Sequence, residues 1–239
     1  MRIQIDKDYA AMSARAADFI LAELKQHPDL LLCASAGGTP TGPYEQLAVR
    51  YTRQPGLFKK MRVVQIDEWV GPPPTHSATC RYDLKTKLLT PLHIDSTRFR
   101  GYKSDAADPH REPKTMSEWL AKNGPIDICI LGLGLNGHIA MNEPGDELVP
   151  QAHVSKLTSQ SQKHAMLATL KPKPRQGLTL GMADILASRK ILLLVSGPTK
   201  TAILTRTLQP KVRTHLPASF LHLHPDVTVF CDRAAASSL

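Results

Sequence analysis

The sequence predicts an α/β fold in which a mostly parallel sheet is covered by helices on both faces. Three observations support this: continuous apolar runs of strand length, amphipathic segments that alternate with them, and glycine or proline turns between the two. Apolar runs without polar alternation are typical of strands buried on both faces, as in parallel sheets. At 239 residues, the chain is long enough for one domain over residues 1–239 and short for two.

The predicted elements follow in a repeating order. Apolar side chains recur at helical spacing through residues 7–26 and stop at His27-Pro28, which predicts an amphipathic helix. The run LLLCAS predicts a buried strand that leads through Gly37-Gly38-Thr39-Pro40 into a second helix at YEQLAVRY. A strand followed by a turn is predicted again at RVVQID, DICILGL and KILLLVSG, with a helix at TAILTRTLQ after the last, and a final strand at VTVFCD.

The stretch over residues 151–176 departs from this order. It is polar, shows no clean period, and ends in the proline-rich segment KPKPR. We expect it to form a mobile helical lid. Ligands of parallel α/β sheets bind at the carboxyl ends of the strands, so the lid would cover a site at that edge.

The charge distribution argues against a nucleic-acid partner. Thirty Lys and Arg against 21 Asp and Glu give a formal charge of +9, which suits either nucleic acid or small anions. The basic residues are scattered and aromatic residues make up only 5% of the chain, so a basic patch with stacking aromatics is not expected. We expect a field that attracts small anionic substrates such as phosphates.

Neither a membrane span nor an export signal is expected. The N-terminal segment lacks a continuous apolar region, and no stretch approaches the roughly 20 apolar residues of a membrane helix. Cysteines 33, 80, 129 and 231 lie far apart without C-x-x-C spacing, and we expect them to be reduced. These observations predict a cytoplasmic protein.

The densest group of candidate catalytic residues lies in GLGLNGHIAMNEPG, residues 132–145. Its glycines spell G-x-G-x-x-G, but a dinucleotide site also needs an acidic residue about 20 positions on, where Leu157 stands. The glycines are therefore expected only to shape a turn. Asn136, His138 and Glu143 follow closely, and a histidine flanked by an amide and a carboxylate has the parts of an oriented acid or base. A satisfied loop histidine is the alternative, and the spacing fits no familiar metal site.

Two further turns carry candidate binding groups. In GGTPTG, the glycines, Thr39 as N-cap and Pro40 as first helical residue would form an anion pocket at a helix N-terminus, although ordinary turn glycines explain the motif equally well. Lys200 begins another helix, where it either meets the same anion or is a surface lysine.

A pair of acidic residues follows the strand RVVQID. Asp67 and Glu68 lie at its end, and a carboxylate there needs a partner or a function because its desolvation is costly. We expect one of the two to be functional.

Taken together, SAGGTPTG, IDEWVG, LGLGLNGHIAMNEPG and LLLVSGPTK resemble the glucosamine-6-phosphate deaminase/isomerase family in order and separation, over roughly residues 30–232. The resemblance implies a Rossmann-like fold and the conversion of an amino-sugar phosphate into a ketose phosphate and ammonia, without metal or nucleotide. It also implies a role for each matching residue: Asp67 as the base that removes the C2 proton, His138 as the group that opens the pyranose ring, Glu143 as its contact, and Gly37, Gly38, Thr39 and Lys200 as the phosphate site.

Two departures from the family pattern bear on the substrate. Asn136 stands where the glucosamine enzymes have aspartate, so it accepts a hydrogen bond without supplying the negative charge that favours an imidazolium at His138. The Asn-Gly-His pattern is most similar to the galactosamine-6-phosphate isomerase branch, whose product is tagatose 6-phosphate. No arginine occurs in residues 157–168, where the family has a phosphate ligand, and Lys163 or Arg175 is expected to substitute.

Three other functions stay open. A glucosamine-6-phosphate deaminase would use the same residues. A 6-phosphogluconolactonase shares the Gly-His turn but activates water and does not require Glu143. A non-catalytic sensor would bind the sugar phosphate alone. In each case the expected partner is a phosphosugar, with neither nucleic acid nor membrane involved, and the sequence leaves open whether the protein forms a homo-oligomer.

Overall fold

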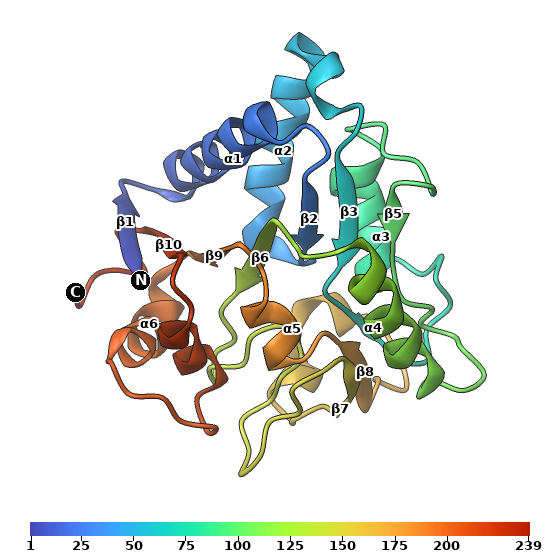
Figure 1. Ribbon diagram of the computed structural model, residues 1–239. Coiled ribbons are helices and arrows are strands. Elements are labelled where there is room, and N and C mark those ends of the chain that lie inside the picture. The colour runs from blue at the N-terminus through green and yellow to red at the C-terminus, as the bar shows by residue number, and fades with distance from the viewer.

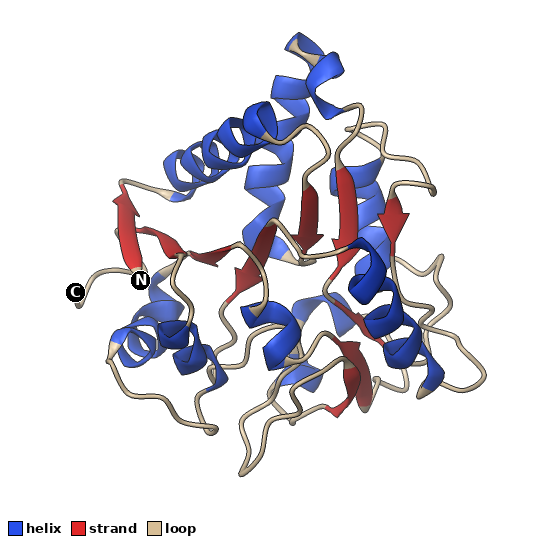
Figure 2. Ribbon diagram, in the orientation of Figure 1, coloured by secondary structure: helices blue, strands red, loops and turns tan.

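Seven parallel strands form the central sheet. The computed structural model describes residues 1–239, and all strand pairs of this sheet run parallel. This confirms the predicted α/β fold (Figure 2). The strands lie in the order β1 (Arg2–Asp6), β10 (Val227–Asp232), β9 (Lys190–Val195), β6 (Ile128–Gly132), β2 (Leu31–Ala34), β3 (Arg62–Gln65) and β5 (Phe99–Arg100).

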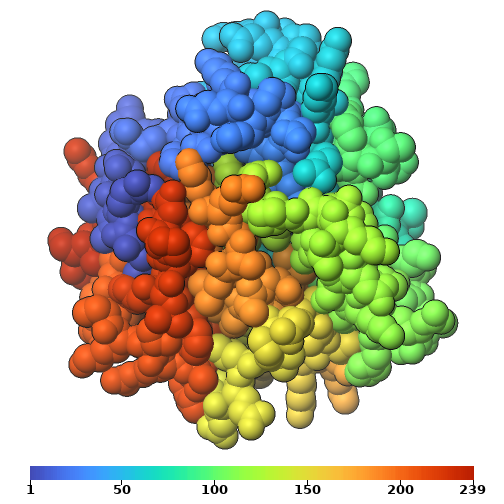
Figure 3. Space-filling model, in the orientation of Figure 1, coloured from blue at the N-terminus to red at the C-terminus, as the bar shows by residue number.

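Helices cover both faces of this sheet because the strands are apolar on both sides. In β2, Leu32 and Ala34 pack into the core under α1 (Tyr9–Gln26) and α2 (Gly38–Arg53), whereas its alternate residues Leu31 and Cys33 enter the opposite core. α1 and α2 lie together on one side of the sheet in Figure 1. The opposite core receives side chains of α4 (Arg111–Asn123), α5 (Met182–Leu186) and α6 (Thr201–Leu208). On the face drawn in Figure 3, α5 (orange) lies between α4 (green) and the C-terminal segment (red).

The order of the strands creates a switch point between β2 and β6. From β2 the chain adds β3 and β5 on one side, and from β6 it adds β9 and β10 on the other. The connections that leave β2 and β6 therefore diverge at their carboxyl ends, which opens a crevice there. This crevice lies between the Gly37 turn and the loop that contains His138.

A small antiparallel sheet lies beside the carboxyl ends of the main strands. It consists of β4 (Asp67–Trp69), β8 (Gln176–Thr179) and β7 (His153–Lys156), and α4 packs against it. Only Ile66 separates β4 from the end of β3, and the small sheet fixes the backbone of Asp67. The short helix α3 (Cys80–Leu84) contacts β4 and continues into a π-helical turn over Lys85–Leu89.

Two expectations from the sequence differ from the structure. In residues 151–176, only two single 3-10 turns, Ser161–Lys163 and Ala165–Leu167, are helical, because β7 pairs with β8 and takes up the first part of the stretch. Thr39 is not an N-cap: α2 begins at Gly38, two residues before the expected start at Pro40. Its cap is Gly37 at a φ of 110°, a backbone conformation that favours glycine.

No helix combines the length and the apolar character that crossing a membrane requires.

Candidate functional site

A cavity of about 320 Å³ lies at the switch point of the sheet. Arg175 is exposed outside this cavity, and a larger open groove of about 600 Å³ beside α3 contains none of the expected site residues. Asn136 and Glu143 do not line the cavity but lie behind His138. Seven residues expected from the sequence line it together: Gly37, Gly38, Thr39, Asp67, His138, Lys163 and Lys200.

The glycines of the loop after β6 allow the imidazole of His138 to fold back on the backbone. A Cβ atom on Gly134 would lie 2.5 Å from the His138 ring. Gly137 has a φ of 89°, and a Cβ there would lie 2.3 Å from Leu216. Any side chain at either position would displace the ring or strain the turn. The glycines thus shape the turn that holds His138, as the sequence predicts.

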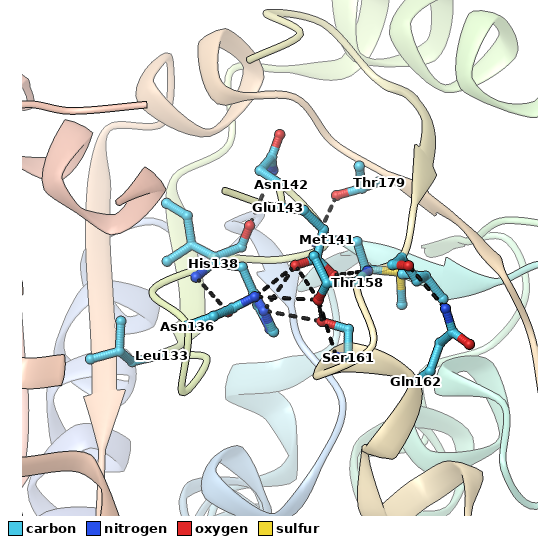
Figure 4. Close-up of polar contacts among 12 residues, drawn as sticks. Leu133, Asn136, His138, Met141, Asn142, Glu143, Thr158, Ser161, Gln162 and Thr179 are labelled. Atoms are coloured by element: carbon cyan, nitrogen blue, oxygen red, sulfur yellow. Dashed lines mark hydrogen bonds and ion pairs between the residues drawn. The ribbon is translucent and has the colours of Figure 1, made fainter. Parts of the chain in front are cut away.

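A hydrogen-bond network orients His138 (Figure 4). The Nδ1 atom of His138 lies 3.6 Å from Glu143 Oε2 and 3.3 Å from Ser161 Oγ. Asn136 accepts a hydrogen bond from the backbone N–H of His138 at 3.2 Å, and its amide nitrogen donates to Glu143 Oε2 at 2.9 Å. Asn136 therefore acts on the imidazole through Glu143 and not by direct contact with the ring.

Glu143 is held as a carboxylate anion. Burial raises its pKa, but hydrogen bonds from His138, Ser161 and Asn136 and the charge of His138 outweigh this effect and lower the pKa to about 2. Thr158 adds two donors, its backbone N–H to Oε1 at 3.3 Å and its hydroxyl to Oε2 at 3.1 Å. A fixed negative charge thus lies next to Nδ1 of His138.

Asp67 has the opposite environment. Its carboxylate lines the cavity, and burial together with repulsion from Glu68 raises its pKa to about 7, while a hydrogen bond with the Cys80 side chain lowers it slightly. A carboxylate with a pKa near neutrality is well suited to take up and return a proton.

Glu68, by contrast, is structural. It is fully buried and accepts backbone N–H groups of Trp69, Cys80 and Arg81 at 2.8–2.9 Å. Its carboxylate thereby joins β4 to the start of α3. Of the acidic pair expected to contain one functional residue, only Asp67 faces the cavity.

The turn after β2 presents backbone donors to the cavity. The N–H of Gly37 is already bonded to Asp83 Oδ2 at 3.0 Å, which fixes the turn from behind. The first N–H groups of α2, on Gly38 and Thr39, have no partner within the helix and carry the positive end of its dipole. The ammonium group of Lys200 donates to the carbonyl of Leu133, and burial lowers its pKa.

Several cavity and network residues were not identified from the sequence. His164 lines the cavity, Ser161 and Thr158 contact the His138–Glu143 pair, and Cys80 contacts Asp67. The first three lie in the polar stretch 151–176, whose lack of periodicity gives no sign of which side chains turn inward.

The arrangement provides a proton-transfer group on each side of one cavity and hydrogen-bond donors at one end. No group of three or more His, Cys, Asp or Glu side chains is placed to hold a metal ion. The polar groups therefore suit acid–base chemistry on a small anionic molecule that is anchored at the N-terminus of α2.

Comparison with known proteins identifies similar chains over the whole length. The profile of the family described as glucosamine-6-phosphate isomerases/6-phosphogluconolactonase matches residues 6–230. A provisionally assigned deaminase, AgaI, from Escherichia coli (strain K12) is 36% identical and covers 93% of this chain and 88% of its own length. The glucosamine-6-phosphate deaminase of Geobacillus sp. (strain WCH70) is 37% identical, with 96% and 92% covered.

Solved structures agree with this family. A monomeric glucosamine-6-phosphate deaminase of the NagB superfamily superimposes with a TM-score of 0.94 at 32% identity, covering 99% of both chains. The 6-phosphogluconolactonase of Trypanosoma brucei shares the fold, with a TM-score of 0.79 at 20% identity over 100% of this chain and 98% of that one.

Proposed function

Because the chain belongs to the family of glucosamine-6-phosphate isomerases and 6-phosphogluconolactonases, we propose that it is a hexosamine-6-phosphate isomerase/deaminase. It converts the amino-sugar phosphate and water into a ketose 6-phosphate and ammonia. The observation that carries the proposal is that Asp67 and the His138–Glu143 pair meet at one cavity, next to the free donors of α2.

In the proposed reaction, the substrate phosphate binds at Gly38, Thr39 and Lys200, with Lys163 as a further cation at the cavity wall. His138 donates a proton to the ring oxygen as the C1–O5 bond breaks, and the C1 hydroxyl gives up its proton to water, which opens the pyranose to the aldehyde. Glu143 stabilises the charged imidazole before this transfer. Binding energy from the phosphate, remote from the reacting carbon, then positions C2 of the open chain.

Asp67 performs the isomerisation step. Its carboxylate removes the proton from C2 while the C1 oxygen takes up a proton from water, which gives an enolamine. The carboxylate then returns its proton to C1, which gives a ketimine at C2. Water adds to the ketimine, the C–N bond breaks, and ammonia leaves as the C2 carbonyl forms. A base with a pKa of about 7 is able to work in both directions near neutral pH.

We propose galactosamine 6-phosphate as the preferred substrate, with tagatose 6-phosphate as product. Asn136 supports this choice because the Asn-Gly-His turn resembles that of the galactosamine branch. The donor role of Asn136 also suits a site with one carboxylate at His138, since an ionised aspartate could not donate to Glu143.

A parallel assay tests both levels of the proposal. Ammonia release is measured with galactosamine 6-phosphate and glucosamine 6-phosphate under the same conditions, and acid production from 6-phosphogluconolactone is followed in a pH-stat. We expect ammonia from both amino sugars and a higher kcat/KM for the galactosamine compound. A higher value for glucosamine 6-phosphate would overturn the substrate choice, and acid from the lactone without ammonia from either sugar would overturn the reaction.

A further inference from the structure

His164 lies at the end of the cavity where α2 begins. Its Cε1 atom is 3.9 Å from the position that a Cβ atom on Gly37 would take. On its other side, the ring packs against Trp69 with a centroid distance of 5.8 Å and an angle of 43°. His164 is exposed, and it lines the cavity itself. The imidazole therefore stands beside the turn that offers its free N–H groups to an anion.

The hydrogen bonds of His164 leave one ring nitrogen free. The Nδ1 atom accepts the backbone N–H of Met166 at 3.3 Å and thereby caps the turn Ala165–Leu167. An acceptor Nδ1 places the proton of the neutral ring on Nε2. The Nε2–H group has no hydrogen-bond partner in the protein, so it remains available as a donor to a bound ligand.

The charges around His164 are complementary to an anion. Protein atoms that replace water at the ring lower its pKa, and the positive charges of His138 and Lys200 lower it further, while Asp83 has the opposite effect. Asp83 lies behind the turn, where it is bound by the Gly37 N–H and paired with Lys87. A phosphate dianion in the cavity would offset the repulsion among these cations, and binding would then favour a proton on His164.

We propose that His164 is a ligand of the substrate phosphate and donates its Nε2–H to the anion held at the start of α2. This rests on the proposed function. Residues 157–168 contain no arginine, and Lys163 and His164 are the only basic residues in this stretch. Lys163, the neighbouring residue, lines the same wall, and Arg175 has no part in the site.

Two substitutions separate donation to phosphate from capping of the turn. His164→Gln keeps an N–H near the position of Nε2 but loses the acceptor for Met166. His164→Asn keeps an acceptor near the position of Nδ1 but has no group at the position of Nε2. His110→Ala is the control, because His110 is exposed away from the cavity.

The binding of inorganic phosphate and of galactosamine 6-phosphate to the full chain is measured by calorimetry in two buffers of different ionisation enthalpy, with KM and kcat alongside. We expect His164→Asn to weaken both ligands and raise KM by about tenfold or more, since a hydrogen bond to a charged group is lost. kcat should change less than KM, and His164→Gln should keep most of the affinity. Proton uptake on binding at pH 7.5 should fall in both variants, and His110→Ala should match the wild type.

The opposite order, with His164→Asn normal and His164→Gln weak, would assign His164 to capping and overturn the proposal. Equal affinity in all variants, or a fall in kcat without a change in KM, would overturn it as well. Phosphate binding does not require turnover, so a wild-type protein that binds phosphate through His164 but releases no ammonia would leave this inference standing and remove the proposed function.

Discussion

The two carboxylates of the site, Asp67 at the cavity wall and Glu143 behind His138, differ in acid strength. Asp67 and Glu143 are both partly withdrawn from water, yet the pKa of Asp67 is raised to about 7 and that of Glu143 is lowered to about 2. The difference lies in their neighbours. Asp67 faces the buried charge of Glu68 with one weak thiol donor, whereas Glu143 receives donors from three side chains and lies next to His138. Pairing, and not burial alone, sets the role of each group.

Removal of the weaker acid should have the largest effect. In Asp67→Asn, the amide cannot accept the C2 proton, and we expect ammonia release to fall by about 10³-fold. Binding of inorganic phosphate should stay unchanged, because the α2 turn is intact. Asp105→Asn, at an exposed carboxylate, is the matched control. Steady-state ammonia assays and phosphate calorimetry check the result, and activity equal to the wild type would remove Asp67 from the mechanism.

Neutralising the stronger acid should have the next largest effect. In Glu143→Gln, His138 keeps its place but loses the adjacent negative charge, and we expect kcat to fall by about 10²-fold. Glu147→Gln tests an exposed carboxylate in the same loop. Because the folded-state pKa of Glu143 lies below the usual unfolded value of about 4.3, its stabilising contribution is present above that pH and is lost as pH falls toward 2.

Thermal unfolding between pH 6 and pH 3 checks this second effect. The wild type should lose more stability over this range than Glu143→Gln. An equal loss of stability in the two proteins would mean that the hydrogen bonds to Glu143 do not lower its pKa in the folded state.

Asn136→Asp should make the surroundings of Glu143 more like those of Asp67, because each carboxylate then has an acidic neighbour. A second carboxylate next to Glu143 replaces a donor by a like charge, which raises the pKa of the pair. Relative to the wild type at the same pH, we expect kcat/KM to be about tenfold lower at pH 8 and less reduced at pH 6, where one shared proton restores a donor. Measurement of kcat/KM for both amino-sugar phosphates at the two pH values decides this. An equal loss of kcat/KM at pH 8 and pH 6 would show that the amide of Asn136 does not act through charge.

The smallest effect is expected from the thiol next to Asp67. In the wild type, kcat/KM should fall about tenfold per pH unit below pH 7, since Asp67 must be ionised to act as a base. Cys80→Ala removes the hydrogen bond that lowers the pKa of Asp67, so the pH below which kcat/KM begins to fall should move up. Cys231→Ala, a buried cysteine in β10, is the control. If kcat/KM falls at the same pH in Cys80→Ala as in the wild type, the thiol does not lower the pKa of Asp67.

Much of the fold could be predicted because its signals are local. The strands β2, β3, β6, β9 and β10 are short apolar runs, and α1 and α2 carry helical periodicity or follow a glycine turn. β1 was missed because most of its residues are exposed at the sheet edge, and the strand segment lacks an apolar run. β4 and β7 were missed because both pair with β8 and neither carries an apolar run that marks it as a strand.

The residues of the candidate site also divide into those that the sequence predicted and those that it missed. The sequence predicted the residues that follow strand ends, because parallel strands bring those ends to one edge, and six of these residues line the cavity. It missed His164, Ser161 and Thr158, which lie in a stretch without periodicity and reach the site only because β7 pairs with β8.

By itself, the sequence determined where the chain turns and which chemical groups stand at the ends of the strands, since glycine conformation and apolar patterning act over a few residues. The tertiary structure alone decided that Asn136 donates to Glu143, that Glu68 is structural, and that Asp67 is a weaker acid than Glu143. Desolvation and hydrogen bonding depend on distances between segments that are remote in the chain, and these distances exist only once the sheet has formed.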